Sequence, residues 1–373
     1  MRVKFSLRLK QLNAVFWIGL SKIFAYFVKP KTWLLCERGT EARDNAYSFY
    51  KYMKSCHPDQ KVYYLITKTS ADFPKVKEDA LIYGSIRSYW VIGSCEKIIS
   101  AHYGAVIPGE LGIKIFPLFK IHEKFFFLQH GVIKDDLKVL YAANAPMKLF
   151  VCGAQPEYED VKRRYGHPEG VVQYTGLARF DYLYDAKPVN QILVMPTWRT
   201  FIHNEKDLIH SEYYQRWQKL LRDERLSAVL KKKNITLLFY MHYEMQKYSE
   251  LFTATSDHVV VAQFGEYDVQ TMLKESKLLI TDYSSVFFDF AYMKKPTVYY
   301  QFDEYHYEKG YFDYFKHGFG PVCDEHDLVI KEICSLIEKE FVLDPIYEER
   351  IHNFFPLHDQ NNCERIYRTI VEK

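Results

Sequence analysis

The sequence predicts an α/β protein that contains two doubly wound parallel sheets and begins with an amphipathic helix. From residue 32 onward, short apolar runs rich in branched and aromatic residues alternate with longer amphipathic stretches, which is the pattern of strand-helix-strand units. A polar segment at residues 185–190 (DAKPVN) separates these runs into two sets of about five. A chain of 373 residues, 48% of them hydrophobic, is long enough to form two domains with separate cores.

The first 30 residues predict a single helix with one apolar stripe. Its longest unbroken apolar run, residues 14–20, is interrupted by Lys22 and falls short of the roughly 20 residues that span a bilayer. No small-residue cleavage site follows, so a signal peptide is not expected. Pro30 ends the helix. The stripe, at spacings of three and four, consists of Phe5, Leu9, Leu12, Phe16, Leu20, Ile23 and Phe27.

The same segment carries all of the protein's charge asymmetry. Residues 1–31 contain seven basic side chains and no acidic one, which leaves 43 of the 50 basic side chains against 47 acidic ones in the rest of the chain. A slightly acidic body does not fit a nucleic-acid-binding protein. Basic residues beside a Leu, Phe and Trp stripe fit a helix lying in the headgroup region of an anionic membrane. The alternative is a helix packed on the body with its basic residues solvated.

Several classes of protein are disfavoured by motifs that the sequence lacks. No P-loop and no GxGxxG loop is present, which disfavours a Walker-type ATPase and a simple dinucleotide oxidoreductase. The seven cysteines are scattered and never form a CxxC pair, so neither a disulfide framework nor a zinc site is expected, and a reducing cytoplasm fits best. The predicted strands of the first set are TWLLC, KVYYLIT, EKIIS, KFFFLQHG and LFVCG, and those of the second set are QILVMPTWR, ITLLFYMHY, HVVVAQF, LLITDYSS and PTVYYQF.

Polar side chains follow several of these strands directly, where the ligand sites of doubly wound sheets lie. His130 precedes Gly131, which would allow a sharp turn, and its imidazole suits a general base near neutral pH. Arg199 and His242 end the first two strands of the second set and can donate to phosphate oxygens. Taken singly, each of these residues has an ordinary structural explanation, and the prediction rests on their common position.

Residues 278–296 (LLITDYSSVFFDFAYMKKP) predict a buried strand, a turn, and a helix that starts near Ser284. The strand delivers Thr281 and Asp282 to the turn, and Ser284 and Ser285 to the helix N-terminus. Backbone N–H groups, hydroxyls and the positive end of the helix dipole would bind an anionic group there, most simply a diphosphate. The alternative is ordinary capping of the helix by Asp282 or Ser284.

The ITDYSSVFFDFAYMKKPTVYY stretch, PTWR, the strand-end His242, TGLARFD at 175–181, the YDVQTML run around Asp268, and HG at 130–131 occur together in one order. In that order and rough spacing the chain resembles the CDP-glycerol glycerophosphotransferase family of teichoic acid primases and polymerases. The resemblance covers roughly residues 95–370.

The resemblance implies a GT-B-like architecture of two Rossmann-like domains facing a cleft. The expected domains are a membrane-associating helix at 1–30, an acceptor domain at 31–187, and a donor domain at 188–373 whose last helix packs back on the acceptor domain. His130 would be the base and His242 a phosphate ligand. The substrate-binding residues would be Gly131, Arg179, Thr197, Arg199, Asp268, Thr281, Asp282, Ser284 and Ser285.

The implied reaction transfers glycerol phosphate or ribitol phosphate from CDP-glycerol or CDP-ribitol to an acceptor hydroxyl and releases CMP. The acceptor would be a lipid-linked or polymeric polyol or sugar, in teichoic acid or capsule synthesis, at the cytoplasmic face of a bacterial membrane. No cofactor is required and no metal-ligand cluster stands out, although Mg²⁺ stays open.

Two other functions remain open at this stage. One is a GT-B glycosyltransferase that uses a nucleotide sugar, because the same fold serves that chemistry. The other is a non-catalytic, membrane-bound subunit of a polymer synthase. The chain also departs from the family with VIKDD after HG, TGLARFD for TGxPRxD, and HY where HP is usual, and these departures leave the acceptor's identity open.

Overall fold

The computed structural model describes residues 2–108, 111–263, 265–304 and 308–373, without the side chains of residues 2–11 and 111–114. The chain divides into two units. Unit 1 comprises Met1–Val132, Leu137–Tyr182 and Leu357–Lys373, and unit 2 comprises Ile133–Asp136 and Leu183–Pro356. The first unit thus changes to the second at 182/183, compared with the expected 187/188, and the last 17 residues of the chain lie in unit 1.

Unit 1 is built around a parallel sheet that has seven strands in the described part of the chain, in the order β3-β2-β1-β4-β5-β6-β7. Successive strands spread first to one side of β1 and then to the other, so the direction of winding reverses between β1 and β4. The strands are β1 (Trp33–Cys36), β2 (Val62–Ile66), β3 (Ala80–Ile82), β4 (Lys97–Ser100), β5 (Phe125–Phe127), β6 (Leu149–Cys152) and β7 (Val172–Tyr174).

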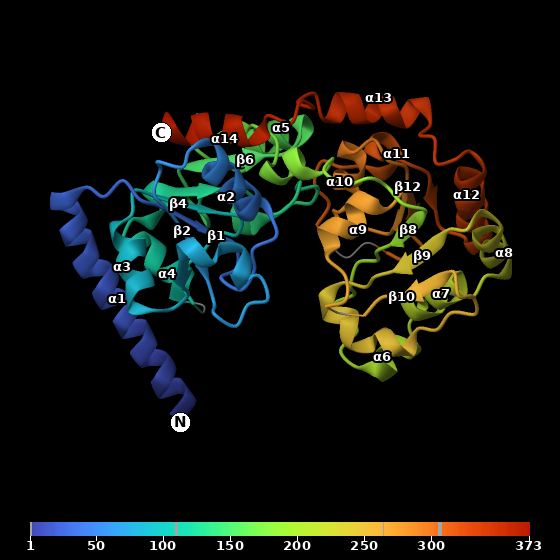
Figure 1. Ribbon diagram of the computed structural model, residues 1–373, viewed down its shortest axis with the longest axis horizontal. Helices are drawn as coiled ribbons and strands as arrows, with labels where there is room; N and C mark the ends of the chain where they lie inside the picture. Colours follow the sequence, from blue (N-terminus) through green and yellow to red (C-terminus); the bar gives the residue numbers. More distant parts are fainter. Residues whose placement is uncertain (1, 109–110, 264, 305–307) are drawn as a thin grey trace. The chain divides into compact units, whose positions relative to one another are not determined.

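Helices connect these strands, and one arrives from the far end of the chain. In Figure 1 the C-terminal helix α14, drawn in red, lies among the blue and green elements of unit 1. Its first backbone N–H groups, from Asn362 and Cys363, donate to the two carboxylate oxygens of Asp181 at 3.0 and 2.7 Å. The helices are α1 (Arg2–Val28), α2 (Asn45–Cys56), α3 (Ile86–Ser94), α4 (Leu111–Leu118), α5 (Gln155–Arg164) and α14 (Asn362–Val371), with short 3-10 turns such as η4 (Ala178–Tyr182) between them.

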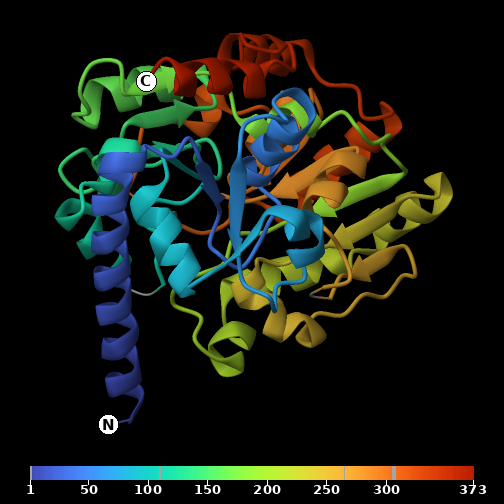
Figure 2. The same cartoon turned by 60° about the vertical axis from the view of Figure 1, so that its left-hand side comes forward.

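The N-terminal helix α1 lies along α3, as both views show (Figures 1 and 2). Ala14, Ile18 and Ser21 are buried on one side of it. Of the predicted apolar stripe, Leu12, Phe16, Leu20, Ile23 and Phe27 are instead exposed, while the side chains of Phe5 and Leu9 lie outside the described residues. No helix in the described part of the chain combines the length and apolarity needed to cross a bilayer.

Unit 2 contains a second parallel sheet, with six strands among the described residues, in the order β10-β9-β8-β11-β12-β13. Its winding reverses between β8 and β11. The strands are β8 (Gln191–Val194), β9 (Thr236–Phe239), β10 (Val259–Val261), β11 (Leu278–Thr281), β12 (Thr297–Tyr300) and β13 (Val322–Cys323); the helices are α6 (Glu205–Ile209), α7 (Glu212–Leu221), α8 (Glu224–Lys233), α9 (Val269–Glu275), α10 (Phe287–Tyr292), α11 (Tyr314–His317), α12 (His326–Glu338) and α13 (Pro345–Phe354).

The apolar runs account for the strands because their side chains form the cores. Ile192, Leu237, Ile280 and Val298 come from four neighbouring strands of unit 2 and are buried around Trp217 of α7. All ten predicted strands are present, and the prediction of an α/β protein with two parallel sheets is confirmed.

Candidate functional site

Arg199 forms the centre of a buried ion cluster at the carboxyl edge of the sheet in unit 2. Its Nε and Nη2 donate to Asp303 at 2.7 and 2.9 Å, its Nη2 also donates to Asp282 at 2.8 Å, and its Nη1 donates to the carbonyl of Thr197 at 2.8 Å. Only 3% of Arg199 is exposed. All three guanidinium nitrogens are therefore engaged within the unit, and Arg199 ties the segment after β8 to those after β11 and β12.

Electrostatics keep this arginine charged. Burial opposes the charge of Arg199, but Asp282 and Asp303 outweigh the burial and raise its pKa. The Arg199 guanidinium also lies 5.3 Å from the ring centroid of Tyr283. In this arrangement the predicted direct contact of Arg199 with a diphosphate would require it to leave a carboxylate partner, which costs several kcal/mol for a buried pair.

The TDYSS turn follows β11, as predicted. Asp282 accepts from the backbone N–H groups of Thr197 and Tyr283 at 2.8 and 2.5 Å, and the hydroxyl of Thr281 donates to the carbonyl of Met195 at 2.7 Å. The predicted helix start near Ser284 is wrong: α10 begins at Phe287, its N-cap is Val286, and no side chain caps it. Asp282 is unable to cap it because its oxygens serve Arg199 and the β8 segment.

Thr197 follows β8, and Ser284 and Ser285 follow the neighbouring strand β11. Ser284 is half-buried and Ser285 is exposed. The hydroxyl of Thr197 is buried and has no hydrogen-bond partner among the described residues. A buried hydroxyl without a partner is costly, so its position beside Asp282 and Arg199 marks the point where a polar ligand group would be accommodated.

His242 follows β9 and stacks on Trp198, with ring centroids 5.9 Å apart and planes 14° apart. Its Nδ1 accepts from the backbone N–H of Glu244 at 3.4 Å. The proton of the neutral ring therefore lies on Nε2, which makes that nitrogen a donor. Trp198 belongs to the PTWR segment, so this stack joins two of the predicted site segments.

A cavity of about 300 Å³ adjoins the TDYSS turn within unit 2. Lys134 lies in its wall and is ion-paired with Asp135 at 2.8 Å. Burial lowers the pKa of Lys134, and Asp135 opposes that effect. The cavity is lined by Lys134, Asp135, Tyr283, Gln301, Lys309 and residues 312–315.

Asp268 is the N-cap of α9, where its carboxylate accepts from the backbone N–H of Thr271 at 2.9 Å. The side chain is exposed. Its placement explains why this residue type occurs at that position, and no other predicted site residue contacts it.

His130 lies at the carboxyl edge of the sheet in unit 1, three residues after β5, and its side chain is exposed. The surrounding protein lowers the pKa of His130, first by desolvation and then through Arg179 and Arg38, while Asp44 and a hydrogen bond to the backbone of Ala101 act in the opposite direction. The ring is therefore neutral at physiological pH. A neutral imidazole has one ring nitrogen without a proton, and that nitrogen is the acceptor that a general base needs.

The backbone around His130 is fixed by a left-handed turn residue and by Arg179. The left-handed residue at this turn is Gln129, with φ of 60°, and not Gly131. Arg179 is buried, and its Nη1 donates to the carbonyl of His130 at 2.6 Å and to Asp44 at 2.7 Å. Arg179 thus fixes the position of the histidine.

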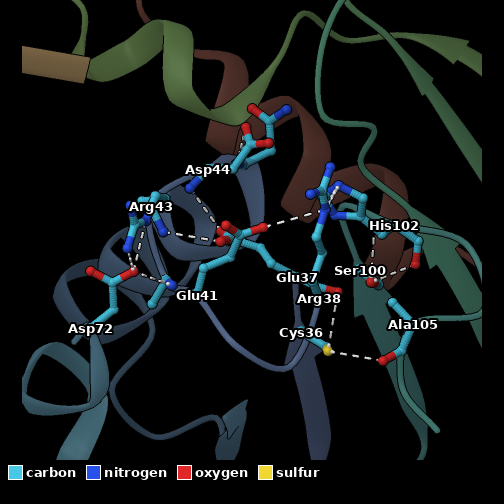
Figure 3. A network of polar contacts seen from close by, with 12 residues as sticks. Cys36, Glu37, Arg38, Glu41, Arg43, Asp44, Asp72, Ser100, His102 and Ala105 are labelled. Carbon is cyan, nitrogen blue, oxygen red and sulfur yellow. Dashed lines mark hydrogen bonds and ion pairs between the residues drawn. The ribbon is translucent and has the colours of Figure 1, made fainter. Parts of the chain in front are cut away.

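His102, two residues after β4, stacks on His130 with ring centroids 4.8 Å apart and planes 12° apart. Figure 3 shows Arg38, from the loop after β1, beside His102, where the Arg38 Nε donates to the His102 Nε2 at 3.0 Å. Burial, His130 and Arg38 lower the pKa of His102 to about 2. His102 is therefore an uncharged ring between the side chains of Arg38 and His130.

A buried carboxylate shapes the loop that carries Arg38. Glu37 is fully buried and accepts from the backbone N–H groups of Arg43 and Asp44 at 3.0 and 2.8 Å (Figure 3). It also accepts from the backbone N–H of Tyr47 at 3.0 Å. These bonds hold the loop against the start of α2. Burial and the neighbouring Asp44 raise the pKa of Glu37 to about 8, against the three N–H donors.

Sequence reasoning missed Arg38, His102, Glu37 and Asp303. The rule that selected His130, a polar residue within three positions of a strand's end, would also have selected Arg38 and His102. Asp303 follows β12 and obeys the same rule. Glu37, which directly follows β1, obeys it too, but only the folded loop shows that its carboxylate binds backbone groups.

The chain is similar to known proteins of teichoic acid synthesis. Residues 154–372 match the sequence model of the CDP-Glycerol:Poly(glycerophosphate) glycerophosphotransferase family. The chain is 34% identical over 367 residues to the minor teichoic acid biosynthesis protein GgaB of Bacillus subtilis, covering 94% of this chain and 41% of that protein. It is 29% identical over 186 residues to the teichoic acid poly(glycerol phosphate) polymerase of the same organism, covering 48% and 24%. The chain thus spans less than half the length of these relatives.

Solved structures share the fold. The wall teichoic acid polymerase TagF superposes with a TM-score of 0.67 at 17% identity, covering 99% of this chain and 95% of that one. The UDP-GlcNAc 2-epimerase of Neisseria meningitidis superposes with a TM-score of 0.58 at 12% identity, covering 92% and 100%. Proteins of different chemistry thus share this architecture, and the fold alone does not select the reaction.

Proposed function

Because the chain belongs to the CDP-glycerol:poly(glycerophosphate) glycerophosphotransferase family, we propose that it transfers glycerol phosphate or ribitol phosphate from a CDP-polyol to an acceptor hydroxyl in teichoic acid or capsular polymer synthesis. The observation that carries the proposal is His130, an exposed, neutral imidazole at a strand end of unit 1 whose backbone is fixed by Arg179. We also propose a GT-B-like arrangement, in which unit 1 binds the acceptor and unit 2 the donor.

In the proposed reaction, His130 takes the proton of the acceptor hydroxyl. The oxygen then forms a bond to the β-phosphorus of the CDP-polyol, while the bond from that phosphorus to the oxygen bridging it to the α-phosphate breaks. CMP leaves with that oxygen. Phosphoryl-type transfer depends mainly on positioning and on stabilising the charge of the transition state, and the protonated Nε2 of His242 is a suitable donor for that charge.

On the donor side, we propose that Ser284, Ser285 and Thr197 contact the diphosphate, and that the cavity at Lys134 accommodates part of the donor. Arg199 and Asp282 hold this turn in place through their mutual ion pair, and Thr281 supports the same turn from within β11. Asp268 is proposed only as a contact to the nucleotide or its phosphates from the start of α9. No metal is required in this scheme, and added Mg²⁺ tests that point.

The test is nucleotide release from purified protein with CDP-glycerol, CDP-ribitol or UDP-sugars, each with a membrane fraction as acceptor source. We expect CMP from one CDP-polyol, dependent on the acceptor, and a loss of roughly 10²- to 10⁴-fold in His130→Ala. His258→Ala, at a half-buried histidine near β10, is the matched control. UDP from a sugar donor without any CMP would contradict the proposal and favour a glycosyltransferase.

We propose in addition that α1 docks the protein on the cytoplasmic face of the membrane as a peripheral anchor. The support is that Leu12, Phe16, Ile23 and Phe27 are each at least 60% exposed, on a segment rich in basic residues, which suits an anionic bilayer surface. Co-sedimentation with anionic vesicles should fall when Phe16, Ile23 and Phe27 are changed to Ser. Equal binding of wild type and variant would reject the anchor.

A further inference from the structure

The point of reversed winding in unit 1 lies between β1 and β4. In open α/β sheets, ligands bind outside the carboxyl ends of the strands at such a point. Arg38 comes two residues after β1 and His102 two residues after β4, so the two side chains flank this point from opposite sides. Their hydrogen bond at 3.0 Å connects the two strands' loops there.

Arg38 retains donors for a ligand. Its side chain is 50% exposed, and the carboxylate nearest to it, Glu41, lies 3.5 Å from Nε. In the described part of the chain, neither Nη1 nor Nη2 of Arg38 has a hydrogen-bond partner. The two terminal nitrogens of a guanidinium form the fork that binds phosphate and carboxylate groups.

The equivalent point of unit 2 provides an internal comparison. There the reversal lies between β8 and β11, and the arginine is Arg199, which is 3% exposed and bound to two carboxylates. Its charge is neutralised within the protein. At the unit 1 point, by contrast, Arg38 is half-exposed, and both its closest partner, the uncharged His102 ring, and its ion-pair partner Glu41 meet it at Nε. The two terminal nitrogens of Arg38 are therefore available to an anion.

His102 lies between the charged Arg38 and the proposed base, His130. One face of its ring stacks on His130, and its Nε2 accepts from Arg38. Arg38 and His130 are thus separated by a single imidazole. A ligand anion on the terminal nitrogens of Arg38 would hold the neighbouring part of the same molecule close to His130.

We propose that the acceptor binds at the β1/β4 point of unit 1, with a phosphate group of its polyol-phosphate end on the Nη1 and Nη2 atoms of Arg38 and its next hydroxyl at His130. The proposal rests on the proposed function and assigns Arg38 as the residue that binds the phosphodiester of the acceptor. His102 is a positioning residue that orients the Arg38 guanidinium.

Binding is tested first, without any donor. The probe is glycerophosphoglycerol, two glycerols joined by one phosphodiester, titrated by calorimetry, with uncharged diglycerol and inorganic phosphate for comparison. We expect Arg38→Ala to weaken binding of the diester roughly 10- to 100-fold, Arg38→Lys to weaken it less, and wild type to prefer the diester over both comparison compounds. Arg163→Ala is the matched control, since Arg163 is an exposed arginine 3.1 Å from Asp160 at the far end of α5.

Thermal melts of each variant accompany the titrations, and Arg38→Lys decides the result if Arg38→Ala does not fold. Equal affinity of wild type and Arg38→Ala for the diester would overturn the proposal. So would equal affinity of wild type for diester and diglycerol, or for diester and inorganic phosphate.

A kinetic measurement separates this proposal from the proposed function. With glycerophosphoglycerol as acceptor, Arg38→Ala should raise KM for the acceptor and leave KM for the CDP-polyol unchanged. Diester binding through Arg38 in a protein that never releases CMP would support the anion site and reject the transferase. CMP release with acceptor affinity and KM unchanged in Arg38→Ala would reject the site alone.

Discussion

At the scale of single residues, the environment of His130 sets the pH range in which it can act as a base. Desolvation lowers its pKa from the ordinary value of 6.5, and Asp44 acts against that effect. A base with a lowered pKa stays deprotonated to lower pH. We therefore expect the acid limb of the pH profile of kcat/KM, measured by CMP release, to lie below 6.5.

Asp44→Asn serves as the directional control for this profile. It removes the negative charge that raises the pKa of His130, so the acid limb should move to still lower pH, while Asn remains a suitable cap for α2. An acid limb at or above 6.5 in wild type, or a shift upward in the variant, would show that another group controls the profile.

The Arg199 cluster predicts a stability effect at the same scale. Arg199→Met leaves the buried Asp282 and the partly buried Asp303 without their cation, which should lower the free energy of unfolding by about 3–5 kcal/mol. Urea unfolding measures it. Lys294→Met is the control, because Lys294 pairs with Glu348 at the surface, where both side chains are exposed, and surface pairs contribute little. Equal midpoints for the two variants would contradict this account of the cluster.

Position relative to strand ends predicted which residues reach the carboxyl edges, but not what each contacts there. His130 and Arg199 were both found by this rule. The structure shows that His130 is exposed and that Arg199 is enclosed by two carboxylates, one of which, Asp303, is 104 residues away in the chain. Such long-range pairing has no local sequence signal.

At the scale of elements, the docking of α1 on α3 depends on one glycine. A Cβ at Gly93 would lie 1.9 Å from the Ser21 Oγ and 2.5 Å from the Ile18 carbonyl oxygen. Gly93→Ala should therefore force the helices apart and cost about 1–3 kcal/mol. Hydrogen exchange of residues 12–28 should become faster in this variant.

Gly19→Ala provides the matched control on the other helix. A Cβ there would meet its nearest atom, from Phe119, at 3.4 Å, which is ordinary contact, and alanine favours a helix over glycine. Exchange in α1 should stay the same or slow. Unchanged exchange in Gly93→Ala would mean that α1 is not held by this contact.

Element prediction succeeded where an apolar run is long enough to form a buried strand. It missed β3, β7 and β13, which have two or three residues each. β5 and β10 are as short as β3 and β7, but their consecutive Phe or Val residues mark them as strands. Element prediction placed the start of α10 three residues too early because Asp282 and Ser284 look like caps in sequence. The structure uses Asp282 for Arg199 instead.

At the scale of the whole molecule, the last 17 residues complete unit 1 and not the unit that precedes them. Ile366 and Ile370 are buried, and Arg365 Nε donates to the carbonyl of Thr175 at 2.9 Å. Deleting residues 357–373 should therefore lower the melting temperature of unit 1. In calorimetry we expect one transition to shift downward while the transition of unit 2 stays in place. A shift of both transitions would show that the two units unfold together.

This return of the chain affects how the protein is made on the ribosome. Synthesis proceeds from the N-terminus, so the strands of unit 1 emerge first, but the carboxylate of Asp181 meets Asn362 and Cys363 only after all of unit 2 has been translated. Unit 2 is complete within residues 133–356 and can mature earlier. Unit 1, which carries His130, therefore completes its fold only after α14 has been translated.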